Sequence, residues 1–167
     1  MFVAGSDTTA SVLRVAMLHR LASPPVYLRL KQEISTAISE GHASSPITNA
    51  ESKRLPYLQA TIYEGIRIRS VSTNMSFQEI PAGGEVYNGE LLPAGTHIGI
   101  NFSSLLRSKA MFGQDAHVFR PERFLDFDQD TGLRMKRDVE LTFGLGRWAC
   151  LGKPVAFLEL NKIFFEV

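Results

Sequence analysis

The sequence has a single cysteine, Cys150, so an internal disulfide and a zinc site built from several cysteines are both excluded. It also lacks an excess of one charge, because 18 Lys and Arg face 17 Asp and Glu and leave a net charge of +1. A general electrostatic attraction to nucleic acid or to an anionic membrane is therefore not expected. No apolar run approaches the roughly 18 residues of a transmembrane helix. What is present, 44% hydrophobic and 21% charged residues in a chain of 167, is typical of one globular domain.

Both ends of the chain are apolar and compatible with helices. Phe2-Val3-Ala4-Gly5 follows Met1 without the positively charged stretch that opens a signal peptide. At the other end Ile163-Phe164-Phe165-Glu166-Val167 stops without a glycine or asparagine cap. Two frayed helix ends would explain this pattern. We favour the alternative that both helices continue in a longer protein.

Hydrophobic spacing and turn residues predict a mainly α fold with a small β subregion. Ser23-Pro24 and Pro56 mark helix starts, and Asn88-Gly89 is typical of a tight hairpin turn. The expected helices span residues 2–19, 24–40, 56–69 and 105–111, and a last helix begins just after Cys150; the expected strands lie within 86–92 and 96–100. Residues 42–53 are expected to form a loop with at most one helical turn, and residues 112–141 a long irregular stretch.

The segment Phe143-Gly144-Leu145-Gly146-Arg147-Trp148-Ala149-Cys150-Leu151-Gly152 has the strongest chemical signature. The two glycines before the thiol allow unusual backbone dihedrals and let a flat ligand approach the main chain. A thiol at a helix start meets free N–H groups and the helix dipole, which favour the thiolate, a soft ligand for iron. A buried cysteine beside a glycine-rich turn is the alternative. However, this glycine, phenylalanine and cysteine spacing arises by chance in fewer than about one in a thousand chains.

Two further pairs of residues stand out, although each is weak alone. Asp7-Thr8 follows Gly5 in the first helix, where Thr8 can bond back to the Ala4 carbonyl and bend the helix. An acid and an alcohol at a widened groove suit proton delivery, but both are also common as helix caps. Glu64 and Arg67 lie at i and i+3 on one helical face. Such a spacing occurs in roughly half of all chains of this length and is often a solvated ion pair.

Taken in order, these motifs resemble the cytochrome P-450 family of haem-thiolate monooxygenases. Phe143–Gly152 is similar to the family's haem-binding loop, and Ala4–Thr9 to its oxygen-activation motif. Glu64–Arg67 resembles its E-x-x-R motif, and Phe119–Phe124 its P-E-R-F motif. Cys150-Leu151-Gly152-Lys153-Pro154, followed by Glu159-Leu160-Asn161-Lys162, is similar to a fungal branch. Because family members are much longer, the resemblance implies that residues 1–167 are the C-terminal portion of a single cytochrome P-450 domain, with no complete second domain.

The resemblance implies a role for each of these residues. Cys150 is expected to be the axial iron ligand of haem b, with Asp7 and Thr8 relaying protons on the opposite face. Arg123 is expected to complete a buried structural network with Glu64 and Arg67. The residues expected to surround the cofactor come from the cysteine loop and are Phe143, Gly144, Gly146, Arg147, Trp148, Cys150 and Gly152.

One position departs from the family pattern. The arginine usually found two residues before the cysteine, where it pairs with a haem propionate, is Trp148 here, and Arg147 comes one place earlier. Trp148 can stack on the propionate or donate its N–H to it, while Arg147 can supply the charge from a shifted direction. The segment 70–77, with polar Ser72, Thr73 and Asn74, faces the substrate by resemblance or is a plain surface loop.

The leading interpretation is an enzyme that inserts one oxygen atom of O2 into a small organic substrate, with electrons from a flavin-containing NADPH reductase. A truncated product without activity, and a haem-binding or interaction module that is not an enzyme, are the alternatives. The resemblance places the full-length protein at the endoplasmic reticulum membrane, although this chain has no membrane segment, and it implies no nucleic-acid partner. The chain alone is expected to be aggregation-prone, to bind haem poorly and to have no turnover, because its first and last helices would expose apolar faces.

Overall fold

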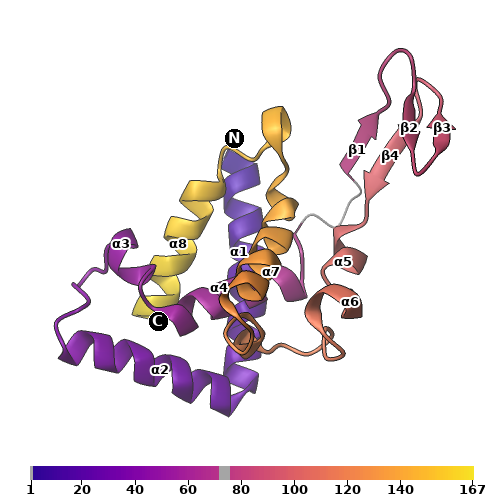
Figure 1. The fold of residues 1–167 in the computed structure, drawn as a ribbon. Coiled ribbons are helices and arrows are strands. Elements are labelled where there is room, and N and C mark those ends of the chain that lie inside the picture. The colour runs from indigo at the N-terminus through magenta and orange to yellow at the C-terminus, as the bar shows by residue number, and fades with distance from the viewer. Residues whose placement is uncertain (1, 72–75) are drawn as a thin grey trace.

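The computed structural model describes residues 2–71 and 76–167, apart from the side chains of residues 2, 3 and 76. The described part is mainly helical, with two small β sheets (Figure 1). The helices are α1 (Phe2–Ala22), α2 (Pro24–Ser39), α3 (Asn49–Ser52), α4 (Pro56–Ile68), α5 (Phe102–Leu105), α6 (Lys109–Phe112), α7 (Gln129–Glu140) and α8 (Lys153–Glu166). The strands are β1 (Ser76–Glu79), β2 (Glu85–Tyr87), β3 (Glu90–Leu92) and β4 (His97–Ile100), and single 3₁₀ turns span Pro121–Phe124, Leu141–Phe143 and Gly146–Trp148.

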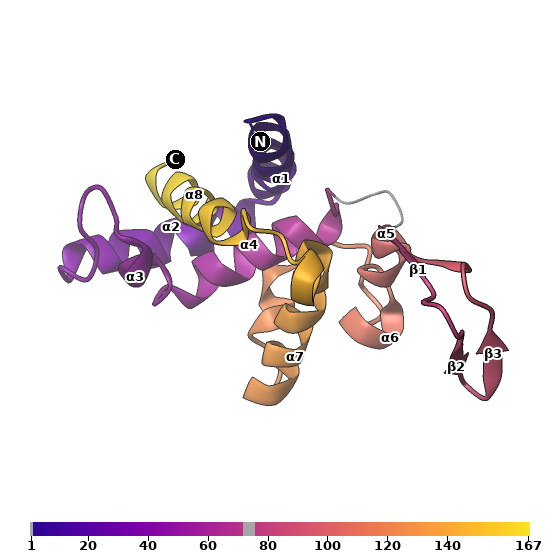
Figure 2. The ribbon, with the colours of Figure 1, turned by 90° about the horizontal axis from the view of Figure 1, so that it is seen from above.

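Helix α4 is the centre of the helical body, and α1, α2, α7 and α8 all pack against it (Figure 2). Pro56 occupies its first turn, where the missing N–H costs no hydrogen bond. Glu33 of α2 caps the same end, since its two carboxylate oxygens accept the N–H groups of Tyr57 and Leu58 at 2.8 Å each. Nearly every residue from Tyr57 to Ile68 is buried. The helix that carries the E-x-x-R motif is therefore held from all sides.

Gly65 allows α1 to cross α4 at close range. A Cβ atom at this position would lie 2.6 Å from the Cβ of Ala16, which is itself fully buried. Two helix backbones can approach this closely only where neither carries a bulky side chain.

We expect Gly65→Ala to destabilise the fold and Gly5→Ala to stabilise it. The first substitution overpacks the α1–α4 contact and should lower the free energy of unfolding by about 1–3 kcal/mol. The second places a methyl group where nothing lies within 4 Å, so it should add up to about 1 kcal/mol through helix propensity alone. Urea denaturation of both variants measures the difference. Equal effects of the two substitutions would contradict the close crossing.

The β region projects away from the helical body (Figures 1 and 2). The predicted hairpin is confirmed: β2 pairs antiparallel with β3 through a two-residue turn in which Asn88 has φ 50° and Gly89 φ 84°. The strand expected at 96–100 is also present as β4. Its partner is β1, in the register Phe77 to Gly99, and the sequence did not predict β1.

The prediction that residues 112–141 are irregular throughout is wrong, because this stretch contains α7. Asp128 caps that helix by accepting the Thr131 N–H at 3.0 Å, and its buried face consists of Gly132, Met135 and Val139. The helix expected at 105–111 is instead two short helices, α5 and α6, on either side of Ser108. The remaining long helices lie where they were expected to within about three residues.

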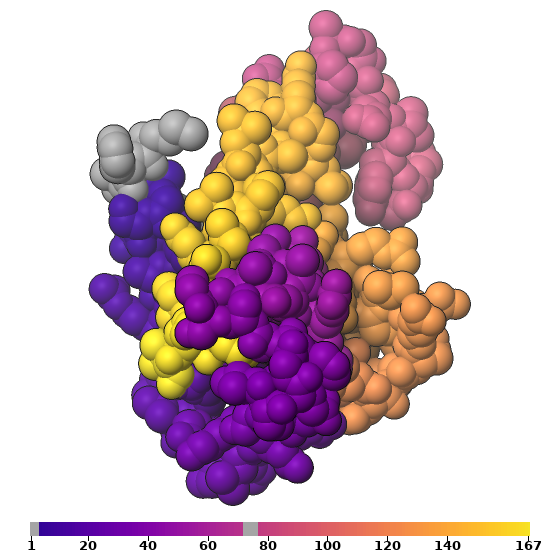
Figure 3. All heavy atoms as spheres, turned by 90° about the vertical axis from the view of Figure 1, so that its left-hand side faces the viewer, coloured from indigo at the N-terminus to yellow at the C-terminus, as the bar shows by residue number. Residues whose placement is uncertain are grey.

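The expectation of unpartnered apolar faces is wrong for α8 and holds only in part for α1. Leu160, Phe164 and Phe165 of α8 are buried, and Figure 3 shows α8 packed among the neighbouring segments. In α1, Val12 and Ala16 are buried, while the side chain of Leu18 is 67% exposed. Among the described residues, no helix combines the length and the apolar character needed to cross a membrane.

Candidate functional site

The cysteine lies at the end of a tight glycine-rich loop. Gly144 and Gly146 adopt φ 74° and 56°, a region that favours glycine. A Cβ on Gly144 would lie 2.5 Å from the Trp148 carbonyl oxygen, so the loop can close only with bare backbone there. The Cys150 N–H donates to the Phe143 carbonyl oxygen at 2.6 Å. These bonds place the Cys150 side chain, which is exposed, just before the first turn of α8.

Aromatic rings anchor the loop to the helical body. The Phe143 ring lies 5.7 Å from that of Phe157 in α8, and Phe157 lies 5.4 Å from Tyr63 in α4. On the outer side, the Arg147 guanidinium lies 5.0 Å from the centre of the Trp148 ring, and Trp148 is 66% exposed. The loop thus has a fixed inner side and an exposed outer side that carries a cation and an indole.

A cavity of about 580 Å³ adjoins the outer side of the loop. One wall is the loop itself, with Leu145, Arg147 and Trp148, and the opposite wall is the β1–β4 sheet, with Ile98 and Ile100. This volume falls in the range of pockets that bind small molecules and cofactors. The cavity is lined mostly by apolar atoms, as a flat hydrophobic ligand requires.

Asp7 and Thr8 lie on the exposed side of α1. The Thr8 hydroxyl donates to the Ala4 carbonyl oxygen at 2.7 Å, as the sequence predicted, and Gly5 leaves open space beside it. Figure 1 shows the start of α1 at the same end of the molecule as the loop before α8. Within the described residues, neither side chain makes a hydrogen bond or ion pair with the cysteine loop.

The structure brings Glu64, Arg67 and Arg123 together in one buried network, although 56 residues separate the two arginines. Arg67 donates two hydrogen bonds to the Glu64 carboxylate, from Nε at 2.7 Å and from Nη2 at 2.8 Å. Arg123 Nε lies 3.0 Å from the same carboxylate. All three side chains are fully or almost fully buried.

The same two arginines also satisfy carbonyl groups of the chain between α5 and the turn at Pro121–Phe124. Arg67 donates to the carbonyl oxygens of Leu106 and Ala116 at 2.7 Å each, and Arg123 donates to that of Val118 at 2.8 Å. These carbonyls have no helical partner, so the guanidinium groups replace the missing backbone bonds. This is how the irregular chain on either side of α6 stays ordered.

Asp115 balances the extra positive charge of the network. Its carboxylate lies 3.0 Å from Arg123 Nη1 and 2.6 Å from Arg120 Nε. Burial raises the pKa of Asp115, but the hydrogen bonds from Arg123 and Arg120 outweigh this effect and lower it overall. Arg120 also pairs with Asp126, so three acids and three arginines form one charge cluster.

Sequence reasoning missed Glu140, which joins three elements beneath the loop. Its carboxylate accepts the Tyr63 hydroxyl of α4 at 2.5 Å and the Lys153 ammonium of α8 at 2.7 Å. Burial raises the pKa of Glu140, yet the bonds from Lys153 and Tyr63 lower it overall. No motif marks this residue. An acidic residue ending a helix is common, and only the fold brings its partners within reach.

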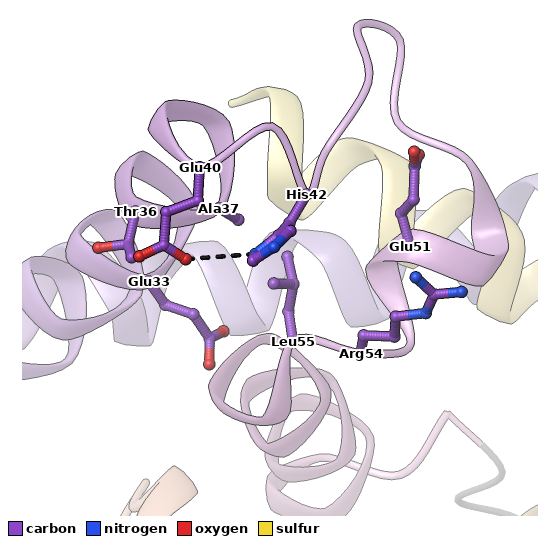
Figure 4. Close-up of a pocket in the computed structure, with 8 residues that line it drawn as sticks. All are labelled: Glu33, Thr36, Ala37, Glu40, His42, Glu51, Arg54 and Leu55. Atoms are coloured by element: carbon purple, nitrogen blue, oxygen red, sulfur yellow. Dashed lines mark ion pairs between the residues drawn. The ribbon is translucent and has the colours of Figure 1, made fainter.

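A second hollow, of about 430 Å³, lies at the other end of the body, between the end of α2 and the start of α4 (Figure 4). His42 Nδ1 there lies 3.2 Å from Glu40 Oε2. Two of its acids serve as helix caps: Glu33 for α4 and Glu51 for α3. No group of three potential ligands suited to a metal ion exists in the described ranges 2–71 and 76–167. Ser72, Thr73 and Asn74, expected either to face the substrate or to form a plain surface loop, lie outside those ranges.

Comparison with known proteins matches residues 1–167 to the family described as Cytochrome P450. The chain is 51% identical over 167 residues to a cytochrome P450 monooxygenase aba1 of Botryotinia fuckeliana, covering all of this chain and 33% of that protein. It is 46% identical to a cytochrome P450 monooxygenase abl1 of Leptosphaeria maculans, covering 99% of this chain and 29% of that protein. It is also 38% identical to a pisatin demethylase of Fusarium vanettenii, covering 98% of this chain and 31% of that protein.

The chain therefore spans about a third of the length of these curated relatives. The match to the family extends over its whole length, and its fold is mainly helical with a small β region. On these grounds, the chain belongs to the cytochrome P450 family.

Proposed function

We propose that residues 1–167 form the C-terminal portion of a single cytochrome P450 domain and supply the iron ligand of a haem-thiolate monooxygenase. The observation that carries the proposal is the only thiol of the chain, exposed at the end of a glycine loop whose preceding residues line a mostly apolar cavity. The reaction is the insertion of one oxygen atom of O2 into a small organic substrate. By itself the chain lacks most of the length of its relatives, so we expect it to have no turnover.

The residues present fit haem b. Cys150 is accessible to iron, and the bare backbone of Gly144 and Gly146 leaves room for a flat ring. Ile98 and Ile100 offer an apolar wall across the cavity. Arg147 and Trp148, exposed at the rim, are suited to pair with the propionates through charge and the indole N–H.

In this proposal the residues of the cysteine loop and of the buried network have different roles. Cys150 binds iron as the thiolate, while Phe143, through its contact with Phe157, keeps the loop in place. Gly152 immediately precedes α8. A Cβ atom at this position would lie 3.7 Å from the Cys150 Sγ, so glycine keeps the space beside the thiol free. The haem supplies the activation of O2, which thiolate ligation assists by favouring O–O cleavage. Glu64, Arg67 and Arg123 hold the surrounding chain and take no part in the chemistry.

Asp7 and Thr8 relay protons from solvent towards the oxygen-binding side. The bond from Thr8 to Ala4 and the space at Gly5 favour a water site within the α1 groove. Electrons come from a flavin-containing NADPH reductase, and the full-length protein resides at the endoplasmic reticulum membrane, as the family resemblance implies. No nucleic acid takes part.

Thr8→Ala, made in the longer monooxygenase, should uncouple oxygen use from product formation. We expect the yield of product per O2 to fall by at least roughly tenfold, with hydrogen peroxide released instead, because positioned proton transfer contributes roughly 10²-fold or more. Thr8→Ser keeps the hydroxyl and should restore coupling. Measuring peroxide and product together tests this, and unchanged coupling in Thr8→Ala would rule out the relay.

The absorption spectrum of the reduced, carbon-monoxide-bound protein tests the proposal as a whole. A thiolate-type Soret band supports it, since only an ionised sulfur ligand produces that band. A histidine-type band would instead favour a haem-binding module that is not a monooxygenase. The absence of any haem signal would favour a fragment without cofactor.

A further inference from the structure

A third cavity, of about 570 Å³, collects positive charge away from the cysteine loop. Its walls come from α3, α4, α7 and the start of α8, and Figure 3 shows the segments around residue 50, α7 and α8 meeting on one face. Lys53, Lys136 and Lys153 line it, and Glu140 is the only acid in its lining. Three lysines against one glutamate leave two surplus positive charges.

The surplus belongs to two particular lysines. Glu140 is already paired with Lys153 at 2.7 Å and accepts the Tyr63 hydroxyl as well. Within residues 2–71 and 76–167, neither Lys53 nor Lys136 has a carboxylate within ion-pair distance. The Lys136 ammonium lies 5.6 Å from the centre of the Tyr63 ring and is partly buried. Burial lowers the pKa of Lys136, and no acid restores it.

A half-buried ammonium without a counter-ion is stabilised when an anion enters beside it. Lys136 is such a group, and the exposed Lys53 lines the same cavity, so together they suit a ligand with two negative charges. A single carboxylate balances only one of them, and the chain already supplies one carboxylate through Glu140. A phosphate group carries close to two charges at neutral pH and offers three acceptor oxygens, and lysine binds phosphate as a point charge.

We propose that this cavity binds the phosphate group of a small molecule through Lys53, Lys136 and Lys153. Its volume leaves room for more than the phosphate alone. The site shares no lining residue with the cavity beside the cysteine loop, and the proposal needs neither haem nor turnover.

Calorimetric titration of the protein with inorganic phosphate, and separately with pyrophosphate, tests the proposal. Chloride keeps the ionic strength constant in both titrations. We expect saturable binding of both, tighter for pyrophosphate. Lys136→Gln and Lys53→Gln should each weaken it by at least roughly tenfold, since each removes a charge-assisted hydrogen bond to the anion. Lys109→Gln is the matched control, because Lys109 is an exposed lysine on α6 outside this cavity and its substitution removes the same charge.

Several outcomes would overturn the inference. The first is the absence of phosphate binding. The second is phosphate binding that chloride abolishes. The third is that Lys109→Gln weakens phosphate binding as much as Lys136→Gln does, which would mean an adventitious ion only. Binding of an acidic peptide without any binding of phosphate would assign the cavity to a protein partner instead. Circular dichroism of each variant confirms that the fold is intact. If phosphate does not bind but the thiolate spectrum is present, only the phosphate-site proposal fails. If the thiolate spectrum is missing but phosphate binds, only the haem proposal fails.

Discussion

Cys150→Ala should abolish the thiolate-type spectrum of the reduced, carbon-monoxide-bound protein. Cys150 is the only cysteine of the chain, so no neighbouring sulfur can replace it. The exposed thiol lies at a loop whose backbone is closed by the bond from the Cys150 N–H to the Phe143 carbonyl. That bond survives the substitution. The variant should therefore keep its fold while losing haem or changing its axial ligand.

Val155→Ala is the matched control for this substitution. It also shortens an exposed side chain at the start of α8, but it lies outside the loop. Its spectrum should be unchanged. Retention of the same thiolate band in Cys150→Ala would show that the iron ligand has been assigned to the wrong residue.

Arg123→Ala and Glu64→Ala are each expected to lower the free energy of unfolding by roughly 3–5 kcal/mol, because each leaves buried charge without its partner. Losing Glu64 would strand two arginines at once, since its carboxylate accepts hydrogen bonds from both Arg67 and Arg123. Losing Arg123 would also leave the Phe112 carbonyl without its donor, while the carbonyls of Asp115 and Val118 would each keep one other donor. Activity per folded molecule should change far less than the folded fraction, and urea denaturation measures the effect.

A double-mutant cycle separates this network from a general loss of packing. Residues that share one hydrogen-bonded network show coupling energies of about 0.5–3 kcal/mol. Arg137→Ala, an exposed arginine of α7, is the control and should shift stability by no more than about 0.5 kcal/mol. Arg123→Lys retains the charge and is suitable if the alanine variant does not fold. A coupling near zero between Glu64 and Arg123 would mean that the two residues do not interact.

Local sequence determined the elements whose causes are local. Pro24 and Pro56 begin α2 and α4 because proline suits the first helical turn. Asn88-Gly89 forms the hairpin turn because both residues tolerate positive φ. The bond from Thr8 to the Ala4 carbonyl spans one helical turn and follows from helix geometry alone. The cysteine loop has the same origin, since its glycines occupy the positions where the backbone must turn.

Tertiary structure alone decided the features that join distant parts of the chain. Helix α7 escaped prediction because charged residues surround its few apolar positions, Met135 and Val139, which are buried only by packing against other elements. Strand β1 exists through its partner β4. Glu140 gains its two partners from α4 and α8. The cavity lined by Lys53, Lys136 and Lys153 forms where α3, α4, α7 and α8 meet. Hydrogen bonds and charges of this kind depend on distances in space, and local propensity does not encode those distances.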